Sequence, residues 1–306
     1  MKTVLLTGAS GFIGSYALKL LLERGYRVYA VSSKAQISEQ RGVEWVQLNL
    51  LDERASKDAV RLLKPTHLLH LAWYAEPPFF WESDQNLLWL ESSLHLFKAF
   101  LESGGRRAVI AGTCAEYQWV GGGKCSETET RCLPNSLYGR AKYSLFLLTQ
   151  KLSALTGISF AWGRLFHLYG PGEHPKKIVR SVISSLLQGR KALCSSGEQL
   201  RDYLHVADAA DALCSLLDSA IEGPVNIGCG NPIQIRDILK KIGEKIGKEE
   251  LIQLGSIPVS SADPAILVPC TGRLENDVKW SPRIDLSDGL EQMIRWMKDE
   301  IHNRHG

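Results

Sequence analysis

Tyr138 and Lys142 stand four residues apart in the segment Tyr-Gly-Arg-Ala-Lys, at the start of a helical pattern over Tyr138–Thr156. Residues four apart lie on one face of a helix, so the phenol and the ammonium group are neighbours. A free tyrosine has a pKa of about 10 and is a poor base at neutral pH. A nearby positive charge lowers that pKa. The pair is therefore suited to passing a proton to or from a substrate oxygen.

A glycine-rich loop follows the first predicted strand, Thr3–Thr7. It reads Thr-Gly-Ala-Ser-Gly-Phe-Ile-Gly over residues 7–14, and a helical pattern continues over Phe12–Arg24. In this setting glycines allow a tight turn, the approach of a pyrophosphate to the backbone and close packing of helix on sheet. The helix N-terminus also attracts phosphates. We therefore expect a dinucleotide to contact Gly8, Ser10, Gly11, Phe12, Ile13 and Gly14.

The residues after the second predicted strand bear on which dinucleotide binds. They read Ser32-Ser33-Lys34, with no acid where an NAD site usually holds the ribose with a carboxylate. Serine and lysine can instead bind a 2′-phosphate, although an ordinary polar loop would have the same composition. We expect NADP(H), with NAD(H) as the alternative. The other expected cofactor contacts lie near the ends of later strands and on the Tyr/Lys helix: Asn49, Leu50, Leu71, Ala72, Tyr138 and Lys142.

Short apolar runs alternate with helical patterns over the first two-thirds of the chain, which predicts an α/β fold with a Rossmann-type doubly wound parallel sheet. After about residue 170 the pattern favours a smaller, interwoven lobe. We assign 1–170 to a dinucleotide-binding domain, to which later segments return, and 171–306 mainly to a substrate lobe. The strands predicted are Thr3–Thr7, Arg27–Val31, Glu44–Asn49, His67–Leu71, Arg107–Ala111, Ser159–Arg164 and 224–227; the helices are Phe12–Arg24, Lys57–Leu63, Asn86–Ser103, Tyr138–Thr156, Arg180–Gln188, Val206–Ser219, Ile235–Ile246 and Leu286–Lys298.

Three motifs together resemble the extended short-chain dehydrogenases, the NAD-dependent epimerase/dehydratase family, over residues 1 to about 298. They are the Thr-Gly-x-x-Gly-x-x-Gly start, the Tyr138/Lys142 pair, and Gly-Arg-Leu-Phe-His-Leu-Tyr-Gly-Pro over residues 163–171. The resemblance implies an NAD(P)-dependent oxidoreductase acting on a nucleotide sugar. It also implies that a Ser or Thr at the end of the fifth strand hydrogen-bonds the reacting oxygen, a position that Thr113 matches. The implied catalytic residues are Thr113, Tyr138 and Lys142.

The residues after Thr113 bear on the reaction. Similar dehydratases carry an Asp-Glu pair there, whereas this chain has Cys114 and Ala115, and strand alternation predicts that Glu116 points away from the site. Similar epimerases keep NAD bound and usually carry the acid that Ser32 replaces. We therefore expect NADPH-dependent reduction of the 4-keto group of a nucleoside-diphosphate-4-keto-6-deoxyhexose, with the proton from Tyr138. The alternative is a nucleotide-sugar 4-epimerase.

Two further possibilities remain open at this point. One is a reductase whose carbonyl substrate has no diphosphate, because serine stands at position 260 where relatives have a diphosphate-binding arginine. Arg273 or the basic cluster over 176–180 would be substitutes for that arginine. The other is a non-catalytic, NADP-sensing protein. The presence of Thr113, Tyr138 and Lys142 favours an enzyme over such a sensor.

The resemblance also implies substrate contacts in the second part of the chain. Arg201 matches an arginine that holds the nucleotide diphosphate, a task suited to the planar guanidinium. His167 stands where relatives have a substrate-binding asparagine, and His174 follows the Tyr-Gly-Pro turn, although a solvent-exposed loop histidine would look the same. Asp202 is expected to orient Arg201 or nearby backbone, and Asp208 to cap the helix that it begins.

Composition sets wider limits. The 306 residues carry a formal charge of +3, too small to favour nucleic acid or a membrane surface as partner, and 44% are hydrophobic. No apolar run approaches the length of a transmembrane helix, and the apolar start is short for a signal peptide, so we expect a cytoplasmic protein. The seven cysteines include no Cys-x-x-Cys pair, which favours reduced thiols over a metal site. The family resemblance implies a homodimer formed through the helices over Asn86–Ser103 and Tyr138–Thr156.

Overall fold

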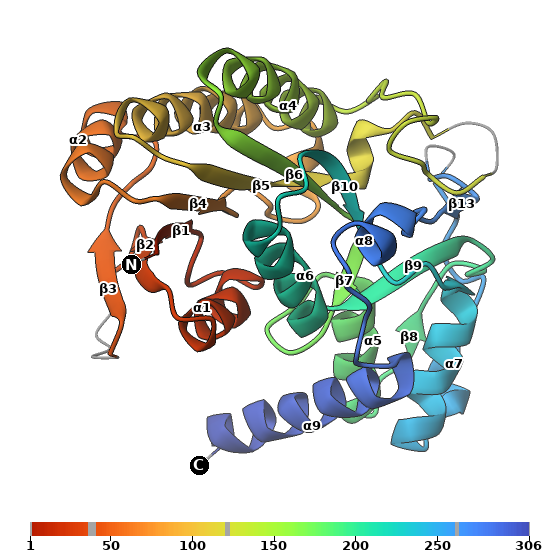
Figure 1. Cartoon of the computed structure of the whole chain (residues 1–306). Helices are drawn as coiled ribbons and strands as arrows, with labels where there is room; N and C mark the ends of the chain where they lie inside the picture. Colours follow the sequence, from red (N-terminus) through yellow and green to blue (C-terminus); the bar gives the residue numbers. More distant parts are fainter. Residues whose placement is uncertain (1, 36–40, 120–122, 261–262, 306) are drawn as a thin grey trace.

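A seven-stranded parallel sheet forms the centre of the computed structural model, which describes residues 2–35, 41–119, 123–260 and 263–305 (Figure 1). Its strand order is β10-β6-β5-β4-β1-β2-β3. The order reverses direction at β1, because β2 and β3 extend to one side of it and β4, β5 and β6 to the other. The doubly wound fold expected from the sequence is confirmed. The strands are β1 (Thr3–Thr7), β2 (Arg27–Ser32), β3 (Val43–Gln47), β4 (His67–His70), β5 (Arg107–Thr113), β6 (Ser159–Leu165) and β10 (Gly223–Ile227).

Helices cover both faces of this sheet, as buried parallel strands require. In Figure 1, α2, α3 and α4 lie on one face and α1 and α6 on the other. Two hydrophobic clusters fill the two interfaces, one around α1 and α6 and one around α3 and α4. The helices are α1 (Gly14–Glu23), α2 (Glu53–Leu63), α3 (Gln85–Glu102), α4 (Leu137–Thr156) and α6 (Val206–Asp218).

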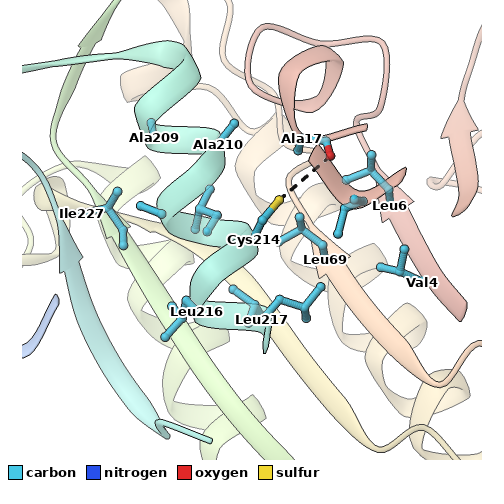
Figure 2. Packing of buried hydrophobic residues seen from close by; sticks show 14 of the residues in the cluster. Val4, Leu6, Ala17, Leu69, Ala209, Ala210, Cys214, Leu216, Leu217 and Ile227 are labelled. Atoms are coloured by element: carbon cyan, nitrogen blue, oxygen red, sulfur yellow. Dashed lines mark hydrogen bonds between the residues drawn. The ribbon is translucent and has the colours of Figure 1, made fainter. Parts of the chain in front are cut away.

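Small side chains let α6 pack closely against α1 and the sheet (Figure 2). Ala209, Ala210 and Cys214 are fully buried in this interface, and the Cys214 thiol lies 3.9 Å from the carbonyl oxygen of Ala17 in α1. The thiol acts here as a small buried hydrophobic group, which agrees with the expectation of reduced core cysteines. Because α6 comes late in the chain, it ties the second part of the sequence to the first.

A smaller sheet and three helices form the second lobe. Strand β9 pairs with β7, β11 and β13, and the helices α5, α7 and α9 enclose a third hydrophobic cluster. The apolar face predicted for the last helix, with Leu290, Met293, Ile294 and Met297, is buried in this cluster. The elements are β7 (His167–Tyr169), α5 (Ile178–Leu187), β9 (Leu200–His205), β11 (Pro232–Gln234), α7 (Ile235–Ile246), β13 (Ile266–Leu267) and α9 (Leu286–His305), and beside them lie the short β8 (Ala192–Leu193), η3 (Glu249–Leu251), β12 (Ile252–Gln253) and α8 (Gly272–Asn276).

Several element ends differ from the prediction for local reasons. Helix α2 begins at Glu53, four residues before the predicted start, because the Asp52 side chain accepts a hydrogen bond from the backbone of Ala55 and caps the helix. Strand β5 continues to Thr113, two residues further than predicted, since β6 pairs with it along this whole length. Strand β3 ends at Gln47, so Asn49 lies in the turn beyond it.

Within the described ranges, the helices are all too short or too polar to cross a bilayer. The same ranges contain no group of three or more His, Cys, Asp and Glu side chains placed to hold a metal ion.

Candidate active site

Thr113 ends β5 and begins a short 3₁₀ turn, η2 (Cys114–Glu116). Its hydroxyl accepts a hydrogen bond from the backbone of Ala115 at 3.2 Å, and the Glu116 carboxylate accepts one from the backbone of Thr113 at 2.8 Å. This reciprocal capping fixes the turn. The Glu116 side chain is fully buried and points to Arg164, with 2.7 Å between Oε2 and Nε. Glu116 therefore shapes the site from behind and, as expected, does not line it.

Tyr138 lies in the first turn of α4 and faces Thr113. The Ser136 hydroxyl caps this helix by accepting a hydrogen bond from the backbone of Gly139 at 3.1 Å. Gly139 allows the close approach of the helix to the turn after β5, since a Cβ there would lie 2.4 Å from the carbonyl oxygen of Ala115. Burial raises the pKa of Tyr138 above its ordinary value, and the neighbouring Thr113 hydroxyl offsets only part of that rise. The two side chains predicted to act together thus lie near each other.

Lys142 lies one helical turn after Tyr138 and is buried. Its ammonium group donates a hydrogen bond to the carbonyl oxygen of Ala111 at 2.6 Å and lies 4.2 Å from the ring centroid of Trp73. Burial lowers the pKa of Lys142 to about 7, although the nearby Glu116 carboxylate acts in the opposite direction. The amine can therefore change its protonation state near neutral pH. The predicted set of Thr113, Tyr138 and Lys142 is brought together at the end of β5.

Aromatic side chains that sequence analysis did not select surround the tyrosine. Phe80 and Trp81 belong to η1 (Phe79–Trp81), and their ring centroids lie 4.9 Å and 5.8 Å from that of Tyr138. Trp119 lies 6.0 Å from Trp81. The aromatic run Phe-Phe-Trp after two prolines was the signal available in the sequence, but only the fold places it over α4.

The glycine loop forms a cradle of the kind that a dinucleotide pyrophosphate needs. Gly8 has a left-handed φ of +67°, and a Cβ on Gly14 would lie 2.0 Å from the Gly8 carbonyl oxygen. Helix α1 begins directly after the loop, and no side chain of the described residues caps its N-terminus at Ile13. The N–H groups of Ser15, Tyr16 and Ala17 already bond to the carbonyl oxygens of Gly11 and Ile13. A phosphate would therefore meet the N–H groups of the loop and of the helix start before Ser15. The chemistry of this loop therefore fits the expected cofactor, and Ser10, Gly11 and Phe12 lie within it.

A buried hydrogen-bond chain stabilises the strand ends beneath this cradle. The Thr7 hydroxyl accepts hydrogen bonds from the backbone of Leu71 and Ala72 at 3.1 and 3.2 Å, so its proton is free for His70 Nδ1 at 2.7 Å. The other ring nitrogen of His70 then donates to Ser93 at 2.9 Å. Burial, aided by Lys142, lowers the pKa of His70 to about 3, so the ring stays neutral. These hydrogen bonds could not be predicted from the sequence, because Thr7 and His70 become neighbours only through the pairing of β1 with β4.

The remaining expected cofactor contacts lie at or just beyond the ends of β2, β3 and β4. Leu71 and Ala72 follow β4, and Ala72 lies directly beneath Gly8. Ser32 ends β2 with its hydroxyl 3.3 Å from that of Ser10, and it accepts a hydrogen bond from the backbone of Lys34. The Ser33 and Lys34 side chains are exposed. Asn49 accepts a hydrogen bond from the backbone of Leu51 in a turn, and Leu50 is buried with its carbonyl oxygen bonded to Ser56 and Ser92.

A pocket of about 460 Å³ lies beside the predicted catalytic residues, with Cys114, Ala115 and Ser136 in its lining. His167 contributes to its wall, and His167 Nδ1 has no hydrogen-bond partner among the described residues. Burial and the charges of Arg201 and Lys177 lower the pKa of His167 to about 3. The pocket is lined by Trp81, Glu82, Cys114, Ala115, Tyr117, Trp119, Asn135, Ser136, His167, Ser260, Asp263 and Leu267.

An ion pair with Asp263 links Arg201 to this pocket. Its guanidinium is buried and pairs with the Asp263 carboxylate, which lines the pocket. His174 is outside the pocket wall, with Nε2 3.3 Å from Glu76 and Nδ1 bonded to the backbone of Lys176. The structure thus brings His167 and Arg201 to the same region and leaves His174 apart from them.

Three neighbouring predictions are settled by hydrogen bonds. Asp202 accepts hydrogen bonds from the backbone of residues 229 and 231, so it orients backbone, as one of its two expected roles required. The helix cap expected of Asp208 was wrong: His205 caps α6, and Asp208 accepts from the backbone of residues 283 and 284. Arg273, considered as a substitute diphosphate ligand, instead donates to the carbonyl oxygens of residues 222 and 224 at the edge of the sheet.

Comparison with known proteins decides the family. The sequence profile of the NAD dependent epimerase/dehydratase family matches residues 4–228, which is most of the chain. The chain belongs to this family. The extended short-chain dehydrogenase expected from the three motifs is thereby confirmed, and with it an NAD(P)-dependent oxidoreductase.

Relatives within the family are similar over their whole length. A probable UDP-glucuronate 4-epimerase of Rhizobium meliloti (strain 1021) is 23% identical, and the alignment covers 98% of both chains. The UDP-glucose 4-epimerase of Thermotoga maritima, solved with UDP-glucose, has a TM-score of 0.87 at 23% identity and covers 98% of this chain and 99% of its own. The dTDP-glucose 4,6-dehydratase of Bacillus anthracis, solved with NAD, has a TM-score of 0.86 at 20% identity and covers 99% and 98%. At these identities the solved structures establish the fold of the family member and leave its reaction open.

Proposed function

We propose that this family member transfers a hydride between a nicotinamide dinucleotide and C4 of a nucleotide-linked sugar. The observation that carries the proposal is the proximity of Thr113 and Tyr138, with Lys142 one turn away on the same helix. The pocket beside these groups has the size of a small-molecule site. When bound, the dinucleotide supplies or receives the hydride, and the glycine loop is the part of this chain that fits its pyrophosphate.

The proton steps are assigned to the chain's own residues. Thr113 orients the reacting sugar oxygen by hydrogen bonding, and Tyr138 gives it a proton in the reducing direction or takes one in the oxidising direction. The Tyr138 hydroxyl must be a phenolate before it can accept a proton. Protonated Lys142 favours that phenolate electrostatically. Burial keeps water from competing for these hydrogen bonds.

Two reactions of this type have separate support. The names of the relatives favour 4-epimerisation, and they support it better than the 4-keto reduction expected from the sequence. The end of β2 favours reduction with NADPH, because Ser10, Ser32 and Lys34 offer hydroxyl and ammonium groups to a 2′-phosphate. Dehydration has weaker support than either, since Cys114 and Ala115 line the pocket where an acid pair would be needed.

The site also suggests how a nucleotide is recognised. We assign the diphosphate to the region of Arg201 and His167, where a guanidinium and a neutral imidazole lie close together. Asp263 holds Arg201 in the free protein, so a diphosphate has to displace that carboxylate or bind beside it. A substrate without diphosphate would leave the pair intact.

The experiment that tests the proposal follows absorbance at 340 nm with NADPH or NADH and a panel of nucleoside-diphosphate-4-keto-6-deoxyhexoses. A parallel assay measures conversion of UDP-hexoses to their 4-epimers. Oxidation of NADPH supports the reductase, and epimer formation without net oxidation supports the epimerase. Failure of both assays, with cofactor binding intact, refutes hydride transfer at C4 of a nucleotide sugar.

We also propose that the chain forms a homodimer through α3 and α4. These two helices pack side by side on one face of the sheet (Figure 1). Both expose leucines to solvent, with Leu87 and Leu88 on α3 and Leu147 and Leu148 on α4 between 46% and 53% exposed. Exposed apolar side chains gathered on one face are typical of an interface.

A further inference from the structure

The pocket wall nearest to Tyr138 is apolar. Trp81 lies 5.8 Å from the tyrosine ring and 6.0 Å from Trp119, and both tryptophans line the pocket together with Cys114 and Ala115. Trp81 is 37% exposed, so its ring has a free surface that a ligand can cover. An apolar wall of this kind favours contact with the uncharged C–H groups of a ligand over contact with its ionised groups.

Two residues that line the pocket are acidic. Glu82 is exposed to solvent, and Asp263 is paired with Arg201. None of the described lining residues is Lys or Arg. His167 is neutral, because its pKa is lowered to about 3. Lys177 acts on His167 and Cys114 from outside the lining, but it is exposed, and its Nζ lies 5.8 Å from the ring centroid of Phe80.

The position of the reacting carbon determines which part of a sugar meets this wall. Tyr138 and Thr113 act on the C4 oxygen in the proposed function, and C6 is attached to the carbon next to C4. The C6 substituent therefore lies close to Tyr138, beside Trp81 and the Cys114–Ala115 turn. Arg201, which is paired with Asp263, is instead the proposed binding site for the nucleotide diphosphate.

We infer that the pocket selects a nucleotide-linked hexose with an uncharged C6, preferring a methyl group to a hydroxymethyl group, and that it rejects a uronate. The inference rests on the proposed function and extends it to the class of sugar. A relative in the same family is named as acting on glucuronate, which carries a carboxylate at C6. In this chain that carboxylate would meet aromatic rings and the Glu82 charge, an arrangement that discriminates by repulsion.

The test compares sugars that differ only at C6. Calorimetric titration of the full chain, saturated with NADP⁺ and carrying Tyr138→Phe to prevent turnover, measures Kd for UDP-glucose, UDP-6-deoxyglucose and UDP-glucuronate. The same three sugars are titrated as dTDP conjugates, since the base is not assigned. We expect the 6-deoxy sugar to bind most tightly and the glucuronate about tenfold or more weakly. Glu82→Gln keeps the acceptor for the backbone of Leu137 and should narrow this gap, whereas Glu23→Gln, at the end of α1, should leave it unchanged.

The outcomes separate the two levels of inference. Glucuronate binding as tight as that of the neutral sugars refutes the selectivity while leaving hydride transfer at C4 intact. Loss of glucuronate binding in Lys177→Met would then identify the cation responsible. If none of the sugars binds while NADP⁺ does, the proposed function fails and the selectivity fails with it.

Discussion

At the scale of single residues, the site depends on a lysine that is costly to bury. Among the described residues, the ammonium group of Lys142 donates one hydrogen bond, to Ala111, and lies over the rings of Trp73 and Trp162. A protonated amine in such a place loses more hydration than these contacts return, so its pKa falls to about 7. A shift of this kind is consistent with the catalytic role proposed for Lys142.

Replacing the tyrosine tests the proton transfer directly. Tyr138→Phe removes the hydroxyl and keeps the ring contacts with Phe80 and Trp81. We expect kcat to fall by roughly 10²- to 10⁴-fold, with unchanged dinucleotide affinity in a fluorescence titration. A variant with near-normal turnover would show that another group moves the proton.

The pH dependence of stability tests the burial of Lys142. Between the folded pKa of about 7 and the unfolded value of about 10.4, the unfolded chain holds the proton and the folded chain does not. The free energy of unfolding therefore rises with pH across this window. Below pH 7 the buried amine is protonated, and it destabilises the folded protein to the full extent that the lowered pKa implies. Relative to wild type, Lys142→Met should be more stable at pH 6 than at pH 10, by roughly 3 to 5 kcal/mol. Urea denaturation of both proteins at these pH values measures it; a constant difference would contradict the prediction.

A single acid should reverse the expected cofactor preference. Ser32→Asp puts a carboxylate beside Ser10 and Lys34, where it would repel a 2′-phosphate and accept a hydrogen bond from a ribose hydroxyl. We expect the Kd ratio of NADPH to NADH to rise by about tenfold or more. Ser256→Asp, at an exposed serine after β12, is the matched control for added charge. No change in the ratio of the two Kd values would mean that the end of β2 does not distinguish NADPH from NADH at the 2′ position of the ribose.

At the scale of elements, function depends on how closely backbones approach. Helix α1 begins within van der Waals distance of the loop before it, and α4 approaches the turn after β5 through Gly139. Both contacts bring a helix start to the edge of the sheet where the strands end. The cofactor cradle and the catalytic tyrosine therefore share one edge, as expected for a doubly wound sheet.

Gly14→Ala tests the first of these contacts. Alanine favours a helix over glycine, but its Cβ would lie 2.0 Å from the Gly8 carbonyl oxygen. We expect the clash to prevail, with a stability loss of roughly 1 to 3 kcal/mol and weaker dinucleotide binding. Gly272→Ala, in α8, is the control because the added Cβ meets no atom closer than 3.8 Å. Thermal unfolding with and without NADPH separates the two effects.

At the scale of the whole molecule, the chain crosses between its lobes more than once. Strand β10 returns to the central sheet and α6 packs on its face, after β7 and α5 have begun the second lobe. The pocket lies where segments of both parts meet, since its lining includes Ala115 and Ser136 as well as Asp263 and Leu267. A ligand there contacts both lobes at once.

The proposed dimer is tested at the same scale. Replacing Leu147 and Leu148 together by glutamate puts charge on the exposed face of α4, and we expect light scattering after size exclusion to show a monomer. Leu62→Glu on α2 is the control, because Leu62 is 82% exposed and lies outside the proposed interface. A double variant that stays dimeric would place the interface elsewhere; a wild-type monomer would refute the dimer itself.

The local sequence determined the family, the fold class and the groups to which we assign the chemistry. The glycine loop, the Tyr138/Lys142 spacing and the strand-end Thr113 are short-range patterns, and each reflects a local requirement of a turn or a helix. The strands of the central sheet and most helix starts were predicted to within a few residues for the same reason, whereas the strands of the smaller sheet were not predicted. Where a helix start or a cap was misjudged, as at Glu53 or Asp208, a side chain forms a hydrogen bond that the pattern does not reveal.

Tertiary structure alone decided what surrounds these groups. The neutral state of His70 needs Thr7 on a neighbouring strand, the pairing of Arg201 needs Asp263 from a distant loop, and the aromatic wall needs Trp81 and Trp119 to meet over α4. These partners are far apart in the sequence, so no periodicity links them. Burial and charge at such contacts set the pKa values and the character of the pocket, because both depend on everything that packs around a group.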